Sequence, residues 1–380
     1  MRDLGTRSLA PPNLRIVPDS KFRLSQDEGK EDRENLRPSA PELLAGAIAF
    51  ALLWPAQTRA GAPENCAPPP GSDVVVNVKD KGAVGDGRTD DTATIQAAID
   101  AVAGTRGTVF VPDGVYMVNA VEKNLRLKSD MTLKLASGAV LKAIPNDATH
   151  YAILTISGVA NVWVTGGTLE GERSAHRGKS GEWGMGIRID DGAKNVTITG
   201  LISKKMWGDG FYVQDAEHVR FCGVTADGNR RQGLSIIHAD GLLVLNSTFK
   251  NTRGTRPSAG IDLEPDKEWQ KIANVRIENS KFFDNAGGGI MVAGKKARVA
   301  KIEMTRNTFR GNRPFVVENA PGIAAAICGN RQTSVQAETS GGFNAYAEPI
   351  EIVALQNDCG ETGFVIDRGD TKKKKKKRAN

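Results

Sequence analysis

The chain has 380 residues, 39% of them hydrophobic, and a formal net charge of +7. The whole excess comes from the run Lys372 to Arg378, because 51 basic residues less these seven leave 44, against 44 acidic residues. The body of the protein is therefore near neutral, which gives no support for a nucleic-acid partner. We interpret residues 367–380 as a solvated, disordered tail.

The first recognisable element is an apolar run at residues 43–54, LLAGAIAFALLW. It is too short to span a bilayer comfortably, and small residues follow it as far as Ala60. This outline is typical of a secretory signal, so we expect a leader over residues 1–60 and an exported protein. The alternative is an uncleaved anchor, the one case in which we expect a membrane partner.

Residues 90–103 are expected to form a helix that caps one end of the fold. Asp90 or Asp91 is placed to cap the start of this helix, and Gly104 follows its end. The apolar residues of the segment recur at the spacing of one buried helical stripe, at Ile95, Ala98, Ile99 and Val102.

From Asn161 to Val317 the chain repeats one phrase every 23 to 34 residues. A short β-branched run is followed by a polar turn, then by Gly and a second alternating run. A repeat made only of strands cannot bury its apolar face alone and must stack on its neighbours. We therefore predict an all-β fold, a single-domain parallel β-helix solenoid over residues 61–366 with an N-terminal capping helix.

The second run of each repeat is expected to build columns of equivalent side chains. Its leading glycines would stack on one another, at Gly186, Gly210, Gly233, Gly260 and Gly289. By period-two alternation, the residues between the buried ones face outward. The first outward column reads Arg188, Tyr212, Ser235, Asp262 and Met291. The second reads Asp190, Gln214, Ile237, Glu264 and Ala293.

Four cysteines, Cys66, Cys222, Cys328 and Cys359, allow three complete disulfide pairings in an exported protein. Cys328 and Cys359 both lie in the last irregular segment, so we expect them to pair. Cys222 lies in a strand and is interpreted as a packing residue.

Two stretches resemble a known family: GAVGDGRTDDTATIQAAID, residues 82–100, and TVFVPDGVY, residues 108–116. Together with the repeats they resemble the pectate-lyase-like superfamily over about residues 73–330. The resemblance implies a right-handed parallel β-helix that acts on polysaccharide. Members with this opening hydrolyse, eliminate, epimerise or only bind, so the resemblance leaves the reaction open.

Asp262 and Glu264 are the candidate catalytic pair. At positions i and i+2 of one strand face, their carboxyl groups are expected about 6 to 8 Å apart. Inverting glycosidases place their acid and base roughly 6.5 to 9.5 Å apart. Asp209 is the third catalytic candidate, expected to position the sugar or tune these acids. The alternative is that the acids only form ion pairs with arginines nearby, namely Arg230, Arg231 or Arg256.

The placement of Asp209 is similar to that of the Asp in the Asn-Thr-Asp-Gly motif of polygalacturonases. The rest of that family's pattern is absent. Its paired aspartates are replaced by Arg231-Gln232, and its Gly-His-Gly by residues 258–260, Ser-Ala-Gly. The Tyr, His and Asp of epimerase-like members are not matched in spacing by Tyr212 and His238 either.

Three tryptophans, Trp183, Trp207 and Trp269, fall in turns bordering the polar columns, where an indole ring could lie against a sugar. Seven further side chains with polar groups are expected to bind the substrate: Arg188, Tyr212, Gln214, Arg230, Arg231, Gln232 and His238.

The sequence therefore predicts a polysaccharide-degrading enzyme, with hydrolysis as the first interpretation and no cofactor. The second is a lyase or epimerase acting on uronate polymers, with an arginine base and Ca²⁺ held by Asp262, Glu264 and Asp209. The third, from outside enzymology, is a non-catalytic carbohydrate-binding or surface-structural β-helix.

Overall fold

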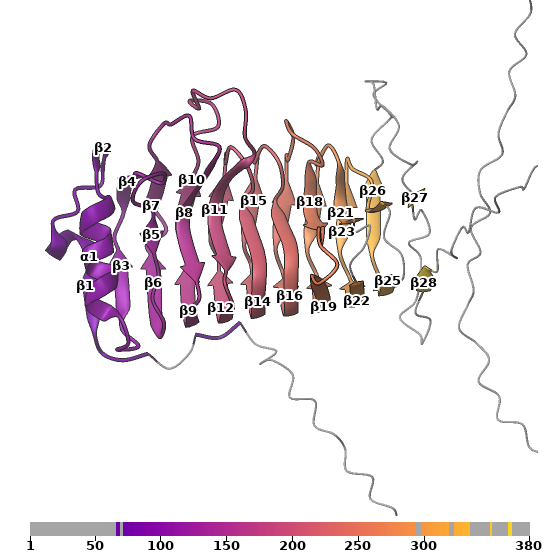
Figure 1. Ribbon diagram of the computed structural model, residues 1–380, viewed down its shortest axis with the longest axis horizontal. Helices are drawn as coiled ribbons and strands as arrows, with labels where there is room; N and C mark the ends of the chain where they lie inside the picture. The colour runs from indigo at the N-terminus through magenta and orange to yellow at the C-terminus, as the bar shows by residue number, and fades with distance from the viewer. Residues whose placement is uncertain are drawn as a thin grey trace, which may run out of the picture.

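The computed structural model describes residues 66–68, 71–293, 298–318, 323–334, 350–351 and 364–366. Within them the chain coils into a right-handed parallel β-helix, whose strands lie side by side along one long axis (Figure 1). Each coil contributes to three rows of strands. The fold expected from the repeats is confirmed.

The first row carries the glycine-led runs and will hold the candidate site. Its parallel strands pair in sequence order, from β5 (Leu125–Arg126) through β8 (His150–Ser157), β11 (Trp183–Asp190), the first part of β14 (Phe211–Cys222), the first part of β16 (Leu234–Leu245), β18 (Ala259–Leu263) and β21 (Gly288–Ala293) to β24 (Phe315–Glu318). A last strand, β27 (Ile350–Glu351), pairs antiparallel to β24.

The second row carries the β-branched runs. Its members are β1 (Val75–Asn77), β3 (Thr108–Val111), β6 (Met131–Leu135), β9 (Ala160–Thr165), β12 (Ala193–Thr199), the second parts of β14 and β16, β19 (Lys271–Glu278), β22 (Arg298–Thr305) and β25 (Ile323–Cys328). Here too the last strand, β28 (Phe364–Ile366), is antiparallel to its neighbour.

The third row forms a separate sheet of short strands. It contains β2 (Asp86–Asp90), β4 (Gly114–Val118), β7 (Ala139–Ala143), β10 (Thr168–Glu170), β13 (Ile202–Lys204), β15 (Thr225–Asp227), β17 (Thr248–Lys250), β20 (Lys281–Phe283), β23 (Thr308–Arg310) and β26 (Arg331–Ser334).

The N-terminal end of the solenoid is covered by the helix α1 (Thr92–Val102), which follows a short 3-10 turn, η1 (Val78–Lys81) (Figure 1). The four apolar residues expected on its inner stripe are all fully buried. The Asp91 carboxylate accepts hydrogen bonds from the amides of Val84 and Gly85, at 2.6 and 2.9 Å. Asp90 accepts one from the amide of Thr92. The acidic residues of this motif therefore shape a turn and a helix start.

The glycine column is confirmed, and the reason for glycine is steric. A Cβ on Gly233 would lie 2.4 Å from the carbonyl oxygen of Gly260, and one on Gly210 would lie 2.7 Å from that of Gly233. Successive coils approach too closely here for any side chain. The inward residues that follow each glycine are buried, and phenylalanines stack inside the third row, at Phe249, Phe282 and Phe309.

Buried amides also connect the coils. The side chain of Asn285 donates to Asn312 and accepts from the amide of Thr252. Asn229 in turn accepts from the amide of Met206. Such side chains satisfy backbone groups where the chain turns inside the solenoid.

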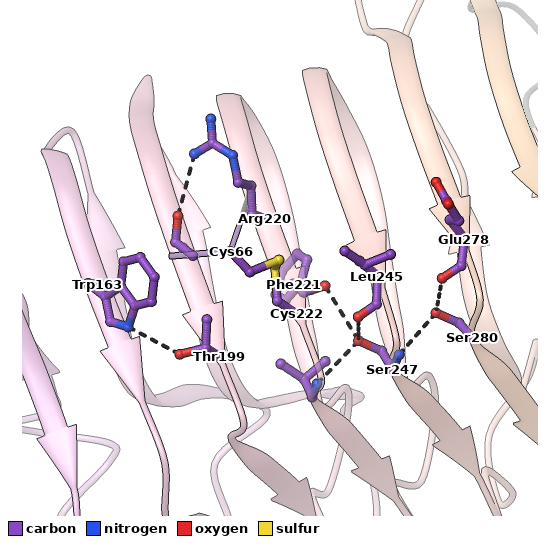
Figure 2. Close-up of a disulfide and its surroundings, with 12 residues drawn as sticks. Cys66, Trp163, Thr199, Arg220, Phe221, Cys222, Leu245, Ser247, Glu278 and Ser280 are labelled. Carbon is purple, nitrogen blue, oxygen red and sulfur yellow. Dashed lines mark hydrogen bonds between the residues drawn. A yellow bond between two sulfur atoms is a disulfide. The ribbon is translucent and has the colours of Figure 1, made fainter. Parts of the chain in front are cut away.

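A disulfide joins Cys66 to Cys222, which lies at the end of β14 (Figure 2). The interpretation of Cys222 as plain packing is therefore wrong, because residues 66–68 reach the outer side of this strand. The expected partner pair cannot be compared, since Cys359 lies outside the described residues.

Within the described part of the chain, no helix is long and apolar enough to cross a membrane. The apolar run at residues 43–54, the rest of the expected leader and the basic tail lie outside that part.

Candidate active site

The first column has the expected register and extends further than the repeats suggested, but the expectation that it faces outward is wrong for its later members, Ser235, Asp262 and Met291, which are buried. Strand register pairs Arg188 with Tyr212, Tyr212 with Ser235, and Ser235 with Asp262. Towards the N-terminus the same column continues through Thr155 to Arg126. Cationic and phenolic side chains therefore stand at the N-terminal end of a continuous row, and Asp262 follows further along it, before Met291.

The second column departs from the expected register. The pairing of β14 with β16 shifts after Val213, so that Gln214 lies beside His238. Ile237 is the additional residue of this irregularity, and its side chain is almost fully buried. Alternation alone placed Ile237 beside Gln214, which is wrong, and the shift brings a titratable histidine to the surface instead.

A cluster of buried carboxylates surrounds Arg231. Asp209 and Asp262 have no exposed surface, and the Arg231 side chain is only 10% exposed. One terminal nitrogen of Arg231, Nη1, lies 3.3 Å from Asp209 Oδ2, and the other, Nη2, lies 3.3 Å from Glu264 Oε2. Its Nε lies 3.5 Å from Glu182 Oε2. The ion-pair interpretation is therefore correct for Glu264, whereas Asp262 accepts a hydrogen bond from Gln232; Asp209 pairs with Arg231 as well.

Asp262 and Glu264 lie closer together than their strand positions predicted. Their carboxyl groups are within hydrogen-bonding reach, not about 6 to 8 Å apart. Asp262 Oδ2 accepts a bond from Gln232 Nε2 at 2.6 Å, and Oδ1 has no donor. Burial and the neighbouring Glu264 charge both oppose ionisation of Asp262, so its pKa is raised and its protonated form is favoured.

Burial dominates the proton affinities of the two hidden acids. It raises the pKa of Asp209 to about 6, against the opposing effect of Arg231. Burial also raises the pKa of Asp262 well above its ordinary value, and the charge of Glu264 adds to this rise. Burial opposes the charged form of Arg231, but the surrounding carboxylates outweigh it and raise the pKa of the guanidinium. Arg231 therefore stays charged.

Two neighbours hold the cluster in place. Ser235 donates to Asp209 Oδ2 at 2.9 Å and accepts from Arg231. Gln232 is fully buried, with its amide nitrogen on Asp262 and its oxygen accepting from the amide of Ala259. The expectation that Gln232 binds substrate is wrong, because both ends of its side chain are used within the protein.

An open groove lies beside this cluster, over β5, β8, β11 and β14. Its volume is about 360 Å³. Arg188 and Tyr212 from the first column line it, together with Gln214 from the second. Its remaining walls carry residues that were not selected from the sequence, including Asn124, Arg126, His150, Tyr151 and Thr155.

The groove residues Arg188 and Tyr212 differ in exposure and in their hydrogen-bonding partners. The Arg188 side chain is half exposed and forms an ion pair with Asp190. The Tyr212 hydroxyl donates to Gln214 Oε1 at 2.6 Å, and burial raises the pKa of Tyr212 to about 12. Tyr212 is therefore a neutral hydrogen-bonding group at ordinary pH.

The three bordering tryptophans have different surroundings. Trp183 lines the groove, is 36% exposed and packs on His150 with ring centroids 4.1 Å apart. Trp269 is 60% exposed and meets the edge of His238. The Trp207 ring instead lies 3.9 Å from both the His176 ring and the guanidinium of Arg230. These two groups cover its faces, so the expectation that Trp207 stacks on a sugar is wrong.

His238 and Arg230 are also engaged by the protein. His238 Nδ1 accepts from the amide of Lys271 at 2.7 Å, which leaves the ring proton on Nε2, 3.8 Å from Asp215. Arg230 Nη1 donates to the carbonyl oxygen of Gly181 at 2.8 Å. Arg230 therefore points away from the acid cluster, although its neighbour Arg231 is the centre of it.

The carboxylates considered as calcium ligands do not fit that role. The guanidinium of Arg231 contacts both Asp209 and Glu264, where a calcium ion would need their free oxygens. Among the residues that the structure describes, no group of three or more acidic, histidine or cysteine side chains is arranged to hold a metal ion.

Part of the missed groove was visible in the sequence. Arg126 and Thr155 each stand between two buried apolar residues, as the selected column members do. Their runs lack the leading glycine, so the glycine-led pattern did not include them. Glu182 gave no such signal because it lies in the turn before β11, and His150 gave none because it begins β8 without a leading glycine.

Comparison with known proteins bears on this geometry. The family model described as rhamnogalacturonase A/epimerase, pectate lyase-like, matches residues 75–290. The chain belongs to this family. The relatives of this chain include enzymes that act on polysaccharide, such as a mannuronan C5-epimerase, beside proteins of uncharacterized activity.

Two curated relatives illustrate the range. The uncharacterized protein YclG of Bacillus subtilis is 27% identical over 311 residues, which is 69% of this chain and 53% of that protein. The mannuronan C5-epimerase AlgE4 of Azotobacter vinelandii is 38% identical over 152 residues, 36% of this chain and 27% of the epimerase. The chain thus spans about half the length of the first relative and less of the second.

Among solved structures, the family 28 exopolygalacturonase of Yersinia enterocolitica aligns with a TM-score of 0.53 at 16% identity, over 71% of this chain and 67% of that one. The pre-mature bacteriophage phi29 gene product 12 gives the same score at 18% identity, over 68% and 42%. At these identities the likeness is one of fold.

Proposed function

We propose that the protein hydrolyses glycosidic bonds in an acidic polysaccharide that lies along the groove. The observation that carries this proposal is the partly exposed Glu264, beside the buried Asp262 whose protonated form is favoured, near a groove lined by Arg126 and Arg188. Arg126 and Arg188 would face the negative groups of the polymer, and Trp183 would lie against a sugar ring.

Glu264 and Asp262 would act as one acid. The Glu264 side chain is 30% exposed, whereas Asp262 is fully buried and cannot touch a sugar. Glu264 would give a proton to the leaving glycosidic oxygen, and Asp262 would resupply that proton to Glu264. Arg231 fixes the position of Glu264 and completes the arrangement.

Glu182 would be the second carboxylate. Its side chain is 35% exposed and lies across Arg231 from Glu264, one residue before the groove residue Trp183. It would accept a proton from the attacking water or add to the sugar carbon itself, as the partner carboxylate of a glycosidase does. The sequence-based hypothesis of a catalytic pair is kept, with Glu182 in the place first given to Asp262.

The test is release of new reducing ends from acidic and neutral polysaccharides. Glu264→Gln and Glu182→Gln are each expected to lower the rate at least about 100-fold, the usual contribution of an acid or base. Glu217→Gln, an exposed carboxylate paired with Lys194, is the control and should retain the parent rate. Full activity in Glu264→Gln would remove this mechanism. Binding without turnover in the parent would instead support the non-catalytic alternative.

A second reaction, elimination or C5 epimerisation of uronate residues, is favoured by one observation. Two guanidinium groups line the groove, and neutralising a uronate carboxylate makes the adjacent C5 proton easier to remove. Products that absorb as unsaturated uronates, or a changed sugar composition without new reducing ends, would support this second candidate against hydrolysis.

We also infer that the protein is exported. The Cys66–Cys222 disulfide supports this, because disulfides form and persist in oxidising compartments. The apolar run at residues 43–54 is the segment that would direct export.

A further inference from the structure

Three arginines from three different connections converge at one turn of the solenoid. Arg173 lies between β10 and β11, Arg230 lies between β15 and β16, and Arg253 lies between β17 and β18. In Figure 1 the first of these connections rises above the coils. Neighbouring turns of a solenoid bring such connections together, although they are far apart in the sequence.

Gly254 is where the three meet. A Cβ on this glycine would lie 2.9 Å from Arg230 Cγ and 3.1 Å from Arg173 Nη2, and Arg253 is the preceding residue. The absence of a side chain at Gly254 therefore allows the two longer side chains to approach the turn. Arg253 itself is exposed to solvent.

Backbone carbonyl groups orient the three guanidinium groups. Arg173 donates to the carbonyl oxygen of Gly228 at 2.7 Å, and Arg253 donates to that of Asp284 at 3.5 Å. Arg230 donates to that of Gly181 at 2.8 Å and lies over the Trp207 ring. Each guanidinium has five N–H donors, so most remain for another acceptor.

The positive charge of this group is not neutralised by the described residues around it. Neither Arg173 nor Arg253 has a carboxylate at ion-pair distance within the part of the chain that the structure describes. Burial lowers the pKa of Arg173, and repulsion from Arg230 and Arg253 lowers it further. The charge of Glu182 favours the charged form of Arg230, but the ion pair that Glu182 forms is with Arg231.

The three arginines are linked to the groove by the segment that precedes β11. The carbonyl group of Gly181 binds Arg230, Glu182 faces Arg231, and Trp183 lines the groove. Residues 181–183 therefore connect Arg230 to the groove wall, and the turn at Gly254 brings Arg173 and Arg253 beside Arg230. A polymer chain leaving the groove over this rim would pass the guanidinium groups.

We propose that Arg173, Arg230 and Arg253 form an anion site that binds a carboxylate or sulfate group of an acidic polysaccharide at the rim of the groove. Planar guanidinium groups match both kinds of oxyanion through paired hydrogen bonds. The polymeric nature of the ligand rests on the proposed function, while the anion site itself does not depend on which reaction the protein performs.

The experiment measures binding in the Glu264→Gln background, where the polymer is not cut. Dissociation constants are measured for polygalacturonate, for a sulfated polysaccharide and for neutral dextran, and inorganic sulfate is then added as a competitor. Arg253→Ala is expected to weaken binding of an acidic polymer about three- to tenfold and to reduce competition by sulfate, with dextran unaffected. Whichever acidic polymer shows the larger loss identifies the preferred group.

Arg306→Ala is the matched control, because it removes one exposed arginine that is paired with Glu278 elsewhere on the solenoid. Equal losses in Arg253→Ala and Arg306→Ala would show a general charge effect and overturn the site. So would a parent protein that binds neither sulfate nor acidic polymers. Unchanged polymer binding when Arg253→Ala is added to the Glu264→Gln background, with normal turnover in the single Arg253→Ala variant, would reject the anion site alone. Tight polymer binding by the parent protein without turnover would reject hydrolysis alone.

Discussion

At Asp262, burial and the neighbouring Glu264 carboxylate act in the same direction, and both favour the protonated acid. At Asp209, burial has the same effect but Arg231 opposes it, which leaves the pKa at about 6. The two aspartates lie two coils apart, with Arg231 from the coil between them opposing the rise at both, and Glu264 adds to the rise only at Asp262. Such differences between neighbouring acids are what proton transfer in an active site requires.

The raised pKa of Asp209 should make stability depend on pH. An unfolded aspartate has a pKa of about 3.9, so between pH 4 and 6 the folded chain binds more protons than the unfolded one. This contribution to stability is fully present below pH 4 and is lost as the pH rises through 6. We expect the free energy of unfolding to fall from pH 4.5 to pH 7, and to fall less in Asp209→Asn.

Urea unfolding at the two pH values measures this slope. Asp80→Asn, which changes an exposed aspartate far from the cluster, should keep the parent slope. An identical slope in Asp209→Asn and the parent would mean that Asp209 is not the group responsible.

At the scale of the strand, the glycine column sets how closely coils can stack. Gly233 has a neighbouring carbonyl oxygen 2.4 Å from the place of a Cβ, and Phe249 Cδ1 lies 2.8 Å away. If a methyl group is added at Gly233, the backbone of the next coil and the ring of Phe249 must both move. This displacement would reach Ser235 and Asp262, which lie in the same row.

We expect Gly233→Ala to lower the free energy of unfolding by about 1 to 3 kcal/mol, the usual range for overpacking. Gly71→Ala is the control, because the nearest atom to its Cβ would be at 3.8 Å. Denaturant midpoints of the two variants give the comparison. A Gly233→Ala protein as stable as the control would contradict the close stacking of these coils.

Strands β14 and β16 show where the expected alternation of side chains was correct and where it was wrong. Alternation placed the first column correctly, because a regular parallel pair keeps its register. It failed at Ile237, where one additional residue in β16 moves His238 into line with Gln214. Nothing in the local composition distinguishes this residue from a normal member of the strand.

For the molecule as a whole, the Cys66–Cys222 bond ties the segment before the cap to the middle of the solenoid, across a sequence separation of 156 residues. A link of this length removes many conformations from the unfolded chain. By the loop-entropy model it stabilises the protein by up to about 5 kcal/mol.

Cys66→Ser is therefore expected to lower the melting temperature, and a reducing agent should lower that of the parent but not of the variant. Protein recovered from outside the cytoplasm should contain this bond, as mass spectrometry of unreduced peptides would show. A parent whose melting is unchanged by full reduction would refute the stabilising role, and a reduced protein confined to the cytoplasm would contradict export.

The amino-acid sequence by itself determined the solenoid, its capping helix, the stacked glycines and the row that holds Asp262, because periodicity and local propensity act over a few residues and repeat in every coil. The contacts of Glu182 with Arg231, the closeness of Asp262 to Glu264, the covered faces of Trp207 and the partner of Cys222 were decided only by the tertiary structure. Each depends on where turns from different coils meet, and the conformation of a turn depends on the coils around it rather than on its own residues.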